Sequence, residues 1–214
     1  MKKLISIISI LILSFSSIGC STPNIYDPVN LAQKFHRNGI YKEAIKLFKE
    51  SAELGNRISQ YNLGTMYYAG QGTKQDYSQA IKWFKKSAEQ GFERAQHNLA
   101  LMYYNGQGTK QDYTQAIKWY TKVAEQGMKE SQHDLALMYY NGKGTKQDYS
   151  QAVKWFKKAA EQGKADSQYN LAIMYSYGQG IKQDEDLAIQ WFKKSAKQGY
   201  KQAQDSLKRR GIEY

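Results

Sequence analysis

The chain has 214 residues, of which 41% are hydrophobic, and its 31 Lys and Arg against 19 Asp and Glu give a formal net charge of +12 at pH 7. This excess favours anionic surfaces, acidic proteins or nucleic acid as partners, and it carries no information about the fold. Two prolines and an abundance of Ala, Lys, Gln, Glu and Leu indicate helices throughout, and a single cysteine excludes the cysteine pairs of a disulfide scaffold.

An export signal is predicted at residues 1–19. Met1 and the two lysines after it form a short basic region, and the apolar stretch that follows is too short to span a bilayer comfortably and precedes no basic stop. Gly19 and Cys20 come next, and the sequence SIGC resembles the bacterial lipobox, in which the cysteine is lipidated and becomes the mature N-terminus. The resemblance implies a lipoprotein signal peptide with lipidation at Cys20. Ordinary cleavage that leaves a free thiol is the alternative, but a lone thiol is a liability in an oxidising compartment.

Ser21 bears on which membrane would hold the lipid. In Gram-negative lipoproteins an Asp directly after the modified cysteine is the usual inner-membrane retention mark, and this chain has Ser21 there. The resemblance therefore implies an outer-membrane lipoprotein of the cell envelope that faces the periplasm, and export argues against nucleic acid as a partner. Residues 20–27 form a short polar tether ahead of the first helix.

The first helical unit, residues 28–56, is shorter than those that follow. Leu31 and Ala44 are 13 residues apart, against 17 residues between Leu63 and Ala80, and the segment FHRNGIYKEAIKLF lacks the glycine pair of the later units. The unit resembles a plain tetratricopeptide repeat, which implies an N-terminal capping repeat.

The stretch NGQGTKQDYTQA at residues 105–116 looks like a phosphate-binding loop, but it recurs. Copies begin at Ala69, Asn105, Asn141 and Tyr177, each 36 residues after the previous one. A fixed period of this length indicates stacked supersecondary units. The glycine spacing also differs from that of a P-loop, and no strand precedes it as a dinucleotide fingerprint requires. The stretch is therefore predicted to be a joint between two helices, and no cofactor is expected.

Residues 57–92 show what one unit contains. Leu63, Met66 and Tyr67 predict the core side of a first helix, and Trp83 predicts that of a second. Two helices alone cannot bury these sides, so the units must stack on one another.

The joint of that unit has its own signals. Gly70 stands where a helix end needs a left-handed residue, and Gly72 lets the chain turn back. Asp76 is placed as the N-cap of the second helix, with Gln79 three residues on as in a capping box.

The pattern LG.MYY.GQGTKQDY.QAIKWFKKSAEQG resembles the Sel1-like repeat, a relative of the tetratricopeptide repeat. The resemblance implies an all-α fold, a right-handed α-solenoid of stacked helix-turn-helix repeats, and a non-enzymatic protein–protein interaction scaffold. A C-terminal capping helix and tail, residues 201–214, would close the stack. The four full units are residues 57–92, 93–128, 129–164 and 165–200.

By the same resemblance, the first helices line the concave side of the solenoid, where a protein or peptide partner would bind. Aromatic side chains are common anchors of such interfaces. The alternative is that the tyrosines pack against neighbouring helices and expose only their hydroxyl groups. The predicted groove residues recur at three positions of each unit and are Tyr61, Thr65, Tyr68, His97, Leu101, Tyr104, His133, Leu137, Tyr140, Tyr169 and Ile173.

No catalytic or metal site stands out from the repeated scaffold. His97 and His133 occupy the same position of successive units, but a zinc site needs three or four ligands and no third is present. A narrower interpretation is a periplasmic immunity or inhibitor protein against a toxic effector. A β-lactamase-like or cell-wall-acting hydrolase is the less favoured alternative, because the cysteine pairs of the family members linked to β-lactam hydrolysis are missing.

Lysines recur at fixed positions of the second helices and of the joints. They predict either a solvated outer side or a side that contacts an anionic envelope surface. The recurring lysines are Lys82, Lys118 and Lys154, then Lys86, Lys122, Lys158 and Lys194, and in the joints Lys74, Lys110, Lys146 and Lys182.

Overall fold

The computed structural model describes residues 27–214, so the predicted signal peptide, Cys20 and all of the tether except Asp27 lie outside the described residues. The described part of the chain forms eleven α-helices and no strand. Consecutive helices pack against one another, which confirms the predicted all-α solenoid. The helices are α2 (Pro28–Arg37), α3 (Tyr41–Glu53), α4 (Arg57–Ala69), α5 (Tyr77–Glu89), α6 (Glu93–Asn105), α7 (Tyr113–Glu125), α8 (Lys129–Asn141), α9 (Tyr149–Glu161), α10 (Ala165–Tyr177), α11 (Glu185–Lys197) and α12 (Lys201–Arg209).

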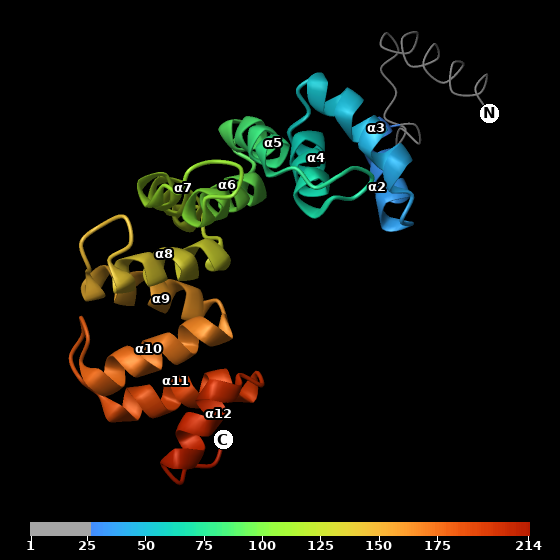
Figure 1. The fold of residues 1–214 in the computed structure, drawn as a ribbon. Coiled ribbons are helices and arrows are strands. Elements are labelled where there is room, and N and C mark those ends of the chain that lie inside the picture. The colour runs from blue at the N-terminus through green and yellow to red at the C-terminus, as the bar shows by residue number, and fades with distance from the viewer. Residues whose placement is uncertain (1–26) are drawn as a thin grey trace, which may run out of the picture.

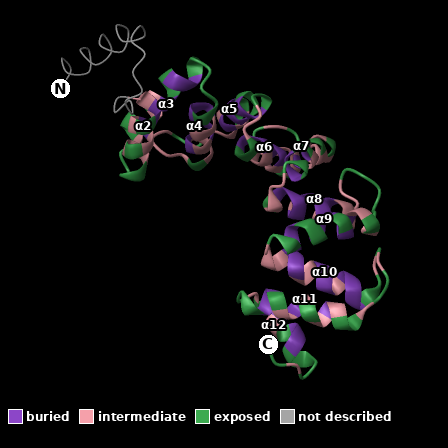
Figure 2. Ribbon diagram, turned by 180° about the vertical axis from the view of Figure 1, so that it is seen from behind, coloured by how far each residue is buried: buried purple, intermediate pink, exposed green. Residues whose placement is uncertain are grey.

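The helices are arranged as pairs, each with a first and a second helix. The first helices are α2, α4, α6, α8 and α10, and the pairs stack along a curved path that ends at α12 (Figure 1). Leu63 and Met66 of α4 are fully buried, as predicted, and so are Leu99, Leu135 and Leu171 at the equivalent place in later units. One buried side therefore runs through the whole stack (Figure 2).

The joints turn the chain between the first and second helix of each pair. Gly70 ends α4 in the left-handed conformation, with φ of 69°. The side chain of Asp76 accepts hydrogen bonds from the backbone N–H groups of Ser78 and Gln79 at the start of α5. The second half of the predicted capping box is wrong, because the N–H of Asp76 donates to the carbonyl of Tyr67 at 2.9 Å instead of to the Gln79 side chain. The same backbone bond joins Asp112 to Tyr103 and Asp148 to Tyr139.

The second glycine of each joint lies against the preceding pair. Gly72 has φ of 73°, and a Cβ atom there would lie 2.5 Å from the carbonyl oxygen of Tyr41 at the start of α3. Gly144 also has φ of 73°, and its Cβ would lie 2.7 Å from the carbonyl of Tyr113. Atoms do not approach so closely, so only glycine lets the pairs stack at this distance.

A buried glutamine ties each first helix to the second helix before it. The Nε2 atom of Gln60 donates to the carbonyl of Ala52 near the end of α3, at 3.1 Å. The same carbonyl also accepts from the backbone N–H of Gly55 at 3.1 Å, so the glutamine adds a second bond at the end of the helix and links it to the next pair. The bond recurs at 2.9 to 3.1 Å between Gln96 and Ala88, Gln132 and Ala124, Gln168 and Ala160, and Gln204 and Ala196.

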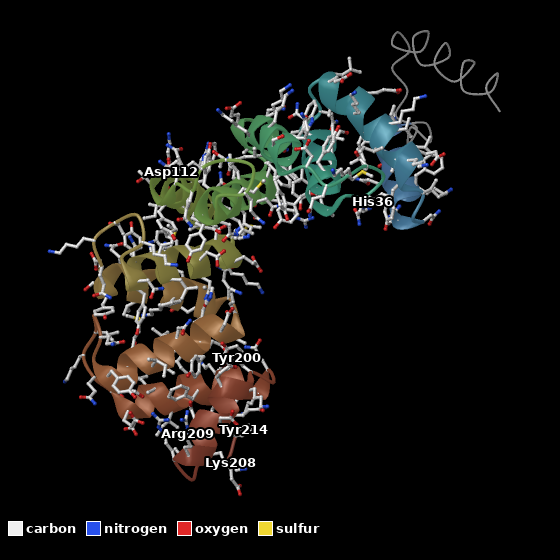
Figure 3. All side chains as sticks on the ribbon, viewed as in Figure 1. His36, Asp112, Tyr200, Lys208, Arg209 and Tyr214 are labelled. Carbon is white, nitrogen blue, oxygen red and sulfur yellow. The ribbon has the colours of Figure 1, made fainter. Side chains whose placement is uncertain are left out.

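The N-terminal unit makes the same contact with its neighbour as the later units do. His36 on α2 packs its ring 5.3 Å from that of Tyr41, and its Nε2 atom lies 2.8 Å from Oε1 of Gln71 in the next joint (Figure 3). Tyr68 on α4 is equivalent, since its hydroxyl donates to Oε1 of Gln107 at 3.2 Å. The shorter first unit therefore stacks in the same way as the full repeats.

The C-terminal end is closed by different side chains. In the earlier units two tyrosines face each other, as Tyr140 and Tyr149 do with ring centroids 5.2 Å apart. Ser176 and Glu185 stand at these positions in the last unit. Arg210, which follows α12, donates from Nε to Oε1 of Glu185 at 3.0 Å. The segment after the last repeat thus takes the place of a further repeat.

Candidate functional site

The predicted groove residues all lie on the first helices α4, α6, α8 and α10. All of them are partly exposed except His133, which is 8% exposed. We call this set the first-helix face. It provides partly exposed aromatic and aliphatic side chains in every full repeat.

The tyrosines near the ends of the first helices also hold the stack together. The ring of Tyr104 lies 5.2 Å from that of Tyr113, and the Nζ atom of Lys143, from the next joint, donates to the Tyr104 hydroxyl at 2.6 Å. The hydroxyl of Tyr140 donates to Oε1 of Gln179 in the following unit at 3.3 Å. These rings are therefore part of the scaffold, and their contact with a partner stays a prediction.

The first and last full repeats each contain three aromatic rings in contact, which we call an aromatic triad. In the first full repeat, the ring of Tyr61 lies 5.8 Å from that of Phe84 and 5.1 Å from that of Phe92. In the last repeat, Tyr169 lies 5.6 Å from Phe192 and 5.4 Å from Tyr200. In the first and the last full repeat, the place around Tyr61 and Tyr169 is therefore filled by contacts between aromatic rings.

The two central repeats replace the aromatic triads with polar side chains. His97 takes the place of Tyr61 and lies 5.5 Å from Tyr120, which is a phenylalanine in the other full repeats. His133 takes the same place in the next repeat, and Lys164 stands where Phe92 closes the first triad. Polar groups are thus concentrated at the two central junctions between repeats.

The first of these junctions joins α6 to α8. The Nδ1 atom of His97 lies 2.9 Å from Oγ of Ser131 and 3.9 Å from Oδ2 of Asp134. Asp134 is an asparagine in the other full repeats. Its side chain is 31% exposed, so its carboxylate remains accessible.

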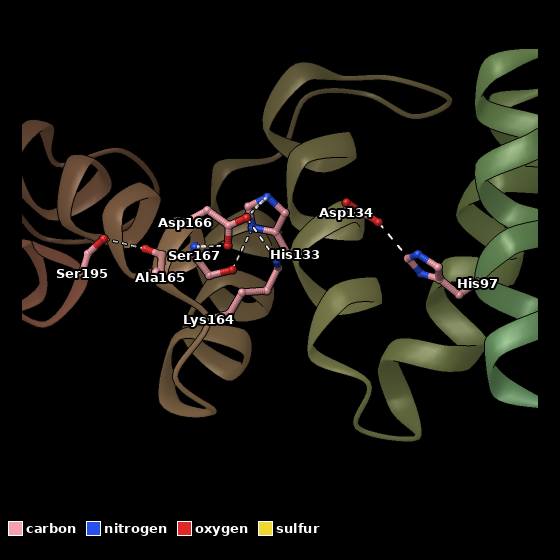
Figure 4. Close-up of polar contacts among 8 residues, drawn as sticks. All are labelled: His97, His133, Asp134, Lys164, Ala165, Asp166, Ser167 and Ser195. Carbon is pink, nitrogen blue, oxygen red and sulfur yellow. Dashed lines mark hydrogen bonds and ion pairs between the residues drawn. The ribbon is translucent and has the colours of Figure 1, made fainter. Parts of the chain in front are cut away.

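The second junction joins α8 to α10 through a similar set of contacts (Figure 4). The Nδ1 atom of His133 lies 2.7 Å from Oγ of Ser167, and its Nε2 atom lies 3.5 Å from Oδ2 of Asp166. The Nζ atom of Lys164 donates to the same Asp166 oxygen at 3.0 Å. We call the polar groups of both junctions the junction cluster, which consists of His97, Tyr120, His133, Asp134, Lys164 and Asp166.

Burial governs the charges of the junction cluster. It lowers the pKa of His97, and it lowers the pKa of His133 to about 4 although the nearby Asp166 acts in the opposite direction. Burial also raises the pKa of Asp134 to about 6, against the attraction of Lys164. At neutral pH the cluster therefore presents neutral imidazole rings beside carboxylates and one ammonium group. Such groups recognise hydrogen-bonding and charged atoms of a ligand.

Sequence analysis placed the two histidines on this face but missed the other members of the junction cluster. A position-by-position comparison of the four copies contains the missing signal, because each of the missed members differs from the residues at the equivalent positions of the other repeats. Tyr120 replaces the phenylalanine of Phe84, Phe156 and Phe192, and Asp134 replaces the asparagine of Asn62, Asn98 and Asn170.

Two general properties of residues 27–214 bear on function. No group of three or more His, Cys, Asp or Glu side chains among them has a geometry that could hold a metal ion, and His97 and His133 contact different junctions (Figure 4). None of their helices combines the length and the apolar composition that a bilayer crossing demands.

Comparison with known protein families identifies the repeats. The Sel1 repeat family model matches residues 30–56, 57–92, 93–128, 129–164 and 165–200, so it includes the short first unit as well as the four full ones. No curated protein matches the chain.

Two solved structures are similar to the chain over most of its length. A protective antigen present in uropathogenic Escherichia coli strains, with an SLR fold, is 35% identical over 83% of this chain and 39% of its own, with a TM-score of 0.81. A Sel1 repeat protein from Oxalobacter formigenes is 34% identical over 84% of this chain and 73% of its own, with a TM-score of 0.77. The chain thus spans well under half of the E. coli protein. From the family match and these similarities, the chain belongs to the Sel1 repeat family, whose stacked helical pairs are typical of protein–protein interaction scaffolds.

Proposed function

We propose that this protein is a non-enzymatic scaffold that binds a protein or peptide partner on its first-helix face, with the junction cluster at the centre. The observation that carries the proposal is the loss of the aromatic triads from the two central repeats only. An aromatic pair contributes about 0.5–1.5 kcal/mol beyond the burial of its area. His97 and His133 each keep one ring contact, with Tyr120 and Phe156, but the second contact of each triad is lost because Met128 and Lys164 stand where Phe92 and Tyr200 close the triads. The two junctions gain polar groups in exchange, which packing of the stack alone does not explain.

The two parts of the face would have different roles in binding. Tyrosine and aliphatic residues such as Tyr104 and Leu137 offer apolar contacts on either side of the junction cluster. The carboxylate of Asp134 and the ammonium of Lys164 would select among partners, because a partner that leaves them unpaired on binding is disfavoured. The partner is thus expected to place complementary polar atoms at the centre and apolar side chains around them.

The proposal extends to the location of the protein. The SIGC sequence and the polar tether support a lipid on Cys20 that holds the solenoid at the outer membrane, facing the periplasm. Contact with an anionic envelope surface belongs to the same proposal. A periplasmic immunity or inhibitor role is a narrower form of it, in which the partner is a toxic effector.

A variant that restores the repeat consensus tests the role of the junction cluster. The full-length triple variant His97→Tyr, Tyr120→Phe and Asp134→Asn introduces only residues that other copies already carry at these positions. A photoreactive amino acid at Leu137, on the same helix as Asp134, reports which protein lies against the face in cells. We expect the cross-linked product of the parent protein to be lost in the triple variant, with helical content maintained and Tm not lowered.

Thr121→Lys is the matched control for this experiment. It also introduces the residue of the other full repeats, at a position of α7 that follows Tyr120 and is not itself a member of the junction cluster. The cross-link should persist in this control. An unchanged product in the triple variant would show that the junction cluster does not contribute to binding.

A further inference from the structure

The exposed side of the second helices α5, α7, α9 and α11 carries a group of lysines in each full repeat. Within α5, α7 and α9 the first and last of these lysines are four residues apart and so share one side of the helix, and in α11 the two lysines are adjacent. All are exposed except Lys193, which is partly exposed. We call this set the lysine face, and it consists of Lys82, Lys85, Lys86, Lys118, Lys122, Lys154, Lys157, Lys158, Lys193 and Lys194.

Tryptophan rings lie directly beneath several of these lysines. The Nζ atom of Lys86 lies 4.6 Å from the ring centroid of Trp83, and that of Lys194 lies 3.9 Å from Trp191. A cation over an indole ring is attracted by the electrons of the ring, so these ammonium groups are held close to the helix surface. Trp83 is only 5% exposed and does not project beyond the lysines. Trp155 is equally buried, whereas Trp119 and Trp191 are partly exposed. The lysine face therefore presents ammonium groups held close to tryptophan rings.

The charges of the lysine face are not neutralised within the molecule. The ion pairs of residues 27–214 lie between His97 and Asp134, in the group of His133, Lys164 and Asp166, and between Arg210 and Glu185, and none of them includes a lysine of this face. Glu89, Glu125 and Glu161 also lie on the second helices, but each stands alone among two or three lysines. Positive charge is thus left for an external anionic surface.

We propose that the lysine face binds the anionic headgroups of a lipid bilayer. Its lysines are distributed over four successive second helices, which suits a surface that presents many separate anions more than it suits a single anionic ligand. The choice of lipid rests on the proposed location, since a chain held by Cys20 meets the bilayer at high local concentration. The first-helix face lies on α4, α6, α8 and α10 and the lysine face on α5, α7, α9 and α11, so the two surfaces share no residue.

Vesicle co-sedimentation of the full-length chain tests the proposal without any protein partner. Phosphatidylcholine vesicles measure the binding that does not depend on lipid charge, and vesicles that also contain phosphatidylglycerol measure the part that does. We expect tighter binding to the anionic vesicles, with the difference abolished at high salt because the lysines are exposed. Equal binding to both kinds of vesicle would refute the proposal.

Matched variants separate the lysine face from the total charge. Glutamine at Lys85, Lys86, Lys157 and Lys158 should weaken the charge-dependent binding by about tenfold or more, whereas arginine at the same four positions should retain it. Glutamine at the joint lysines Lys74, Lys110, Lys146 and Lys182 removes the same charge elsewhere and should have little effect. Equal losses in the two glutamine variants would overturn the assignment to the lysine face. Binding to a DNA duplex as tight as that to the anionic vesicles, at the same salt, would overturn the assignment to lipid.

The vesicle experiment tests lipid binding separately from binding of the proposed protein partner. None of the lysine variants changes the first-helix face, and the triple variant of His97, Tyr120 and Asp134 changes none of these lysines. Loss of the photo-cross-link in one experiment and loss of vesicle binding in the other therefore report on separate surfaces.

Discussion

The Nδ1 atom of His97 and the Oδ2 atom of Asp134 lie 3.9 Å apart, so an imidazole of one repeat faces a carboxylate of the next across a single junction. Burial acts on these two groups in opposite directions, because the neutral form is the protonated one for Asp134 and the deprotonated one for His97. The pH dependence of stability at this junction is therefore a balance between them.

Asp134→Asn should stabilise the protein at pH 7. The folded-state pKa of Asp134 is about 6, above its ordinary value of 3.8, so the folded state holds the proton more strongly and the carboxylate costs stability above pH 6. Asparagine removes this cost, which we expect to be about 1–2 kcal/mol after screening by solvent at a partly exposed side chain. Urea unfolding followed by circular dichroism at pH 7 measures the change in the free energy of unfolding. A loss of stability at pH 7 would contradict the prediction.

The same variant should become more sensitive to acid. The pKa of His133 falls from 6.5 to about 4 on folding, so the unfolded state binds more protons in this range and stability declines as the pH falls through it. In the parent protein, Asp134 becomes protonated as the pH falls from 6 to 4, which removes the cost of its buried carboxylate and opposes this decline in stability. Unfolding curves between pH 7 and pH 4.5 should therefore show a larger loss for Asp134→Asn than for the parent. His133→Tyr is the converse control and should show a smaller loss.

Gly108→Ala should destabilise the protein more than Gly127→Ala. Both glycines have positive φ, of 71° and 101°, so each alanine brings backbone strain of about 1–2 kcal/mol. A Cβ at Gly108 would in addition overlap the carbonyl of Tyr77 in the preceding pair, whereas a Cβ at Gly127 would meet no atom within 4 Å. We expect an additional loss of about 1–3 kcal/mol at Gly108, and Gly108→Val should be worse still. Urea unfolding measures the loss of unfolding free energy in each variant. Equal losses in the two alanine variants would show that the stacking of the pairs does not require a glycine at position 108.

Arg210→Ala should loosen only the C-terminal end of the stack. The Arg210 guanidinium lies 4.9 Å from the ring centroid of Phe192 and is hydrogen-bonded to Glu185 at 3.0 Å. Both charged groups are partly exposed, so the expected loss is about 1 kcal/mol. Amide hydrogen exchange should become faster in α11 and α12 and stay unchanged in α4 to α8. Arg209→Ala is the matched control, since the side chain of Arg209 hydrogen-bonds to Asp205 and Ser206 within α12 and its loss should leave α11 unchanged.

Replacing Tyr104 and Tyr140 together with alanine should weaken capture of the protein partner. Both residues lie on the central part of the first-helix face. Their rings also pack against Tyr113 and Tyr149, so the double variant should lose about 2–4 kcal/mol of stability as well. Cross-linking from Leu137 is therefore compared at a temperature where circular dichroism shows full helical content. The double phenylalanine variant keeps the rings and removes only the hydroxyl groups. Undiminished cross-linking in the alanine variant would show that the tyrosines serve packing alone.

Much of the fold follows from local chemistry that repeats along the chain. The 36-residue period is visible because the same residues recur in each copy. The helix-ending glycines and the N-cap aspartates can be predicted because each acts on a helix end only a few residues away. Asp76 has one hydrogen bond that the local sequence predicts and one that it does not. Its side chain caps the next helix as predicted, but its N–H group turns back to Tyr67, a bond that depends on how the two helices of the pair meet.

The candidate site was only partly predictable for the same reason. The sequence placed His97 and His133 on the first helices, but it did not show that His97 meets Ser131 and Asp134 of the next repeat. Contacts between residues about one period apart depend on the rotation and spacing between successive pairs, which no local signal records.

The sequence by itself determined that this protein is a stack of helical pairs, because the period, the turn glycines and the buried apolar residues recur in every copy. Only the tertiary structure decided what the departures from that repetition mean. Stacking brings residues from separate copies together, so His97, which packs on Tyr120 of its own repeat, faces Asp134 of the next, although the sequence presents the three as isolated exceptions. It also decided that the second glycine of each joint is a contact point between pairs, since the overlap of a Cβ with the Tyr77 carbonyl arises only when two pairs are packed side by side.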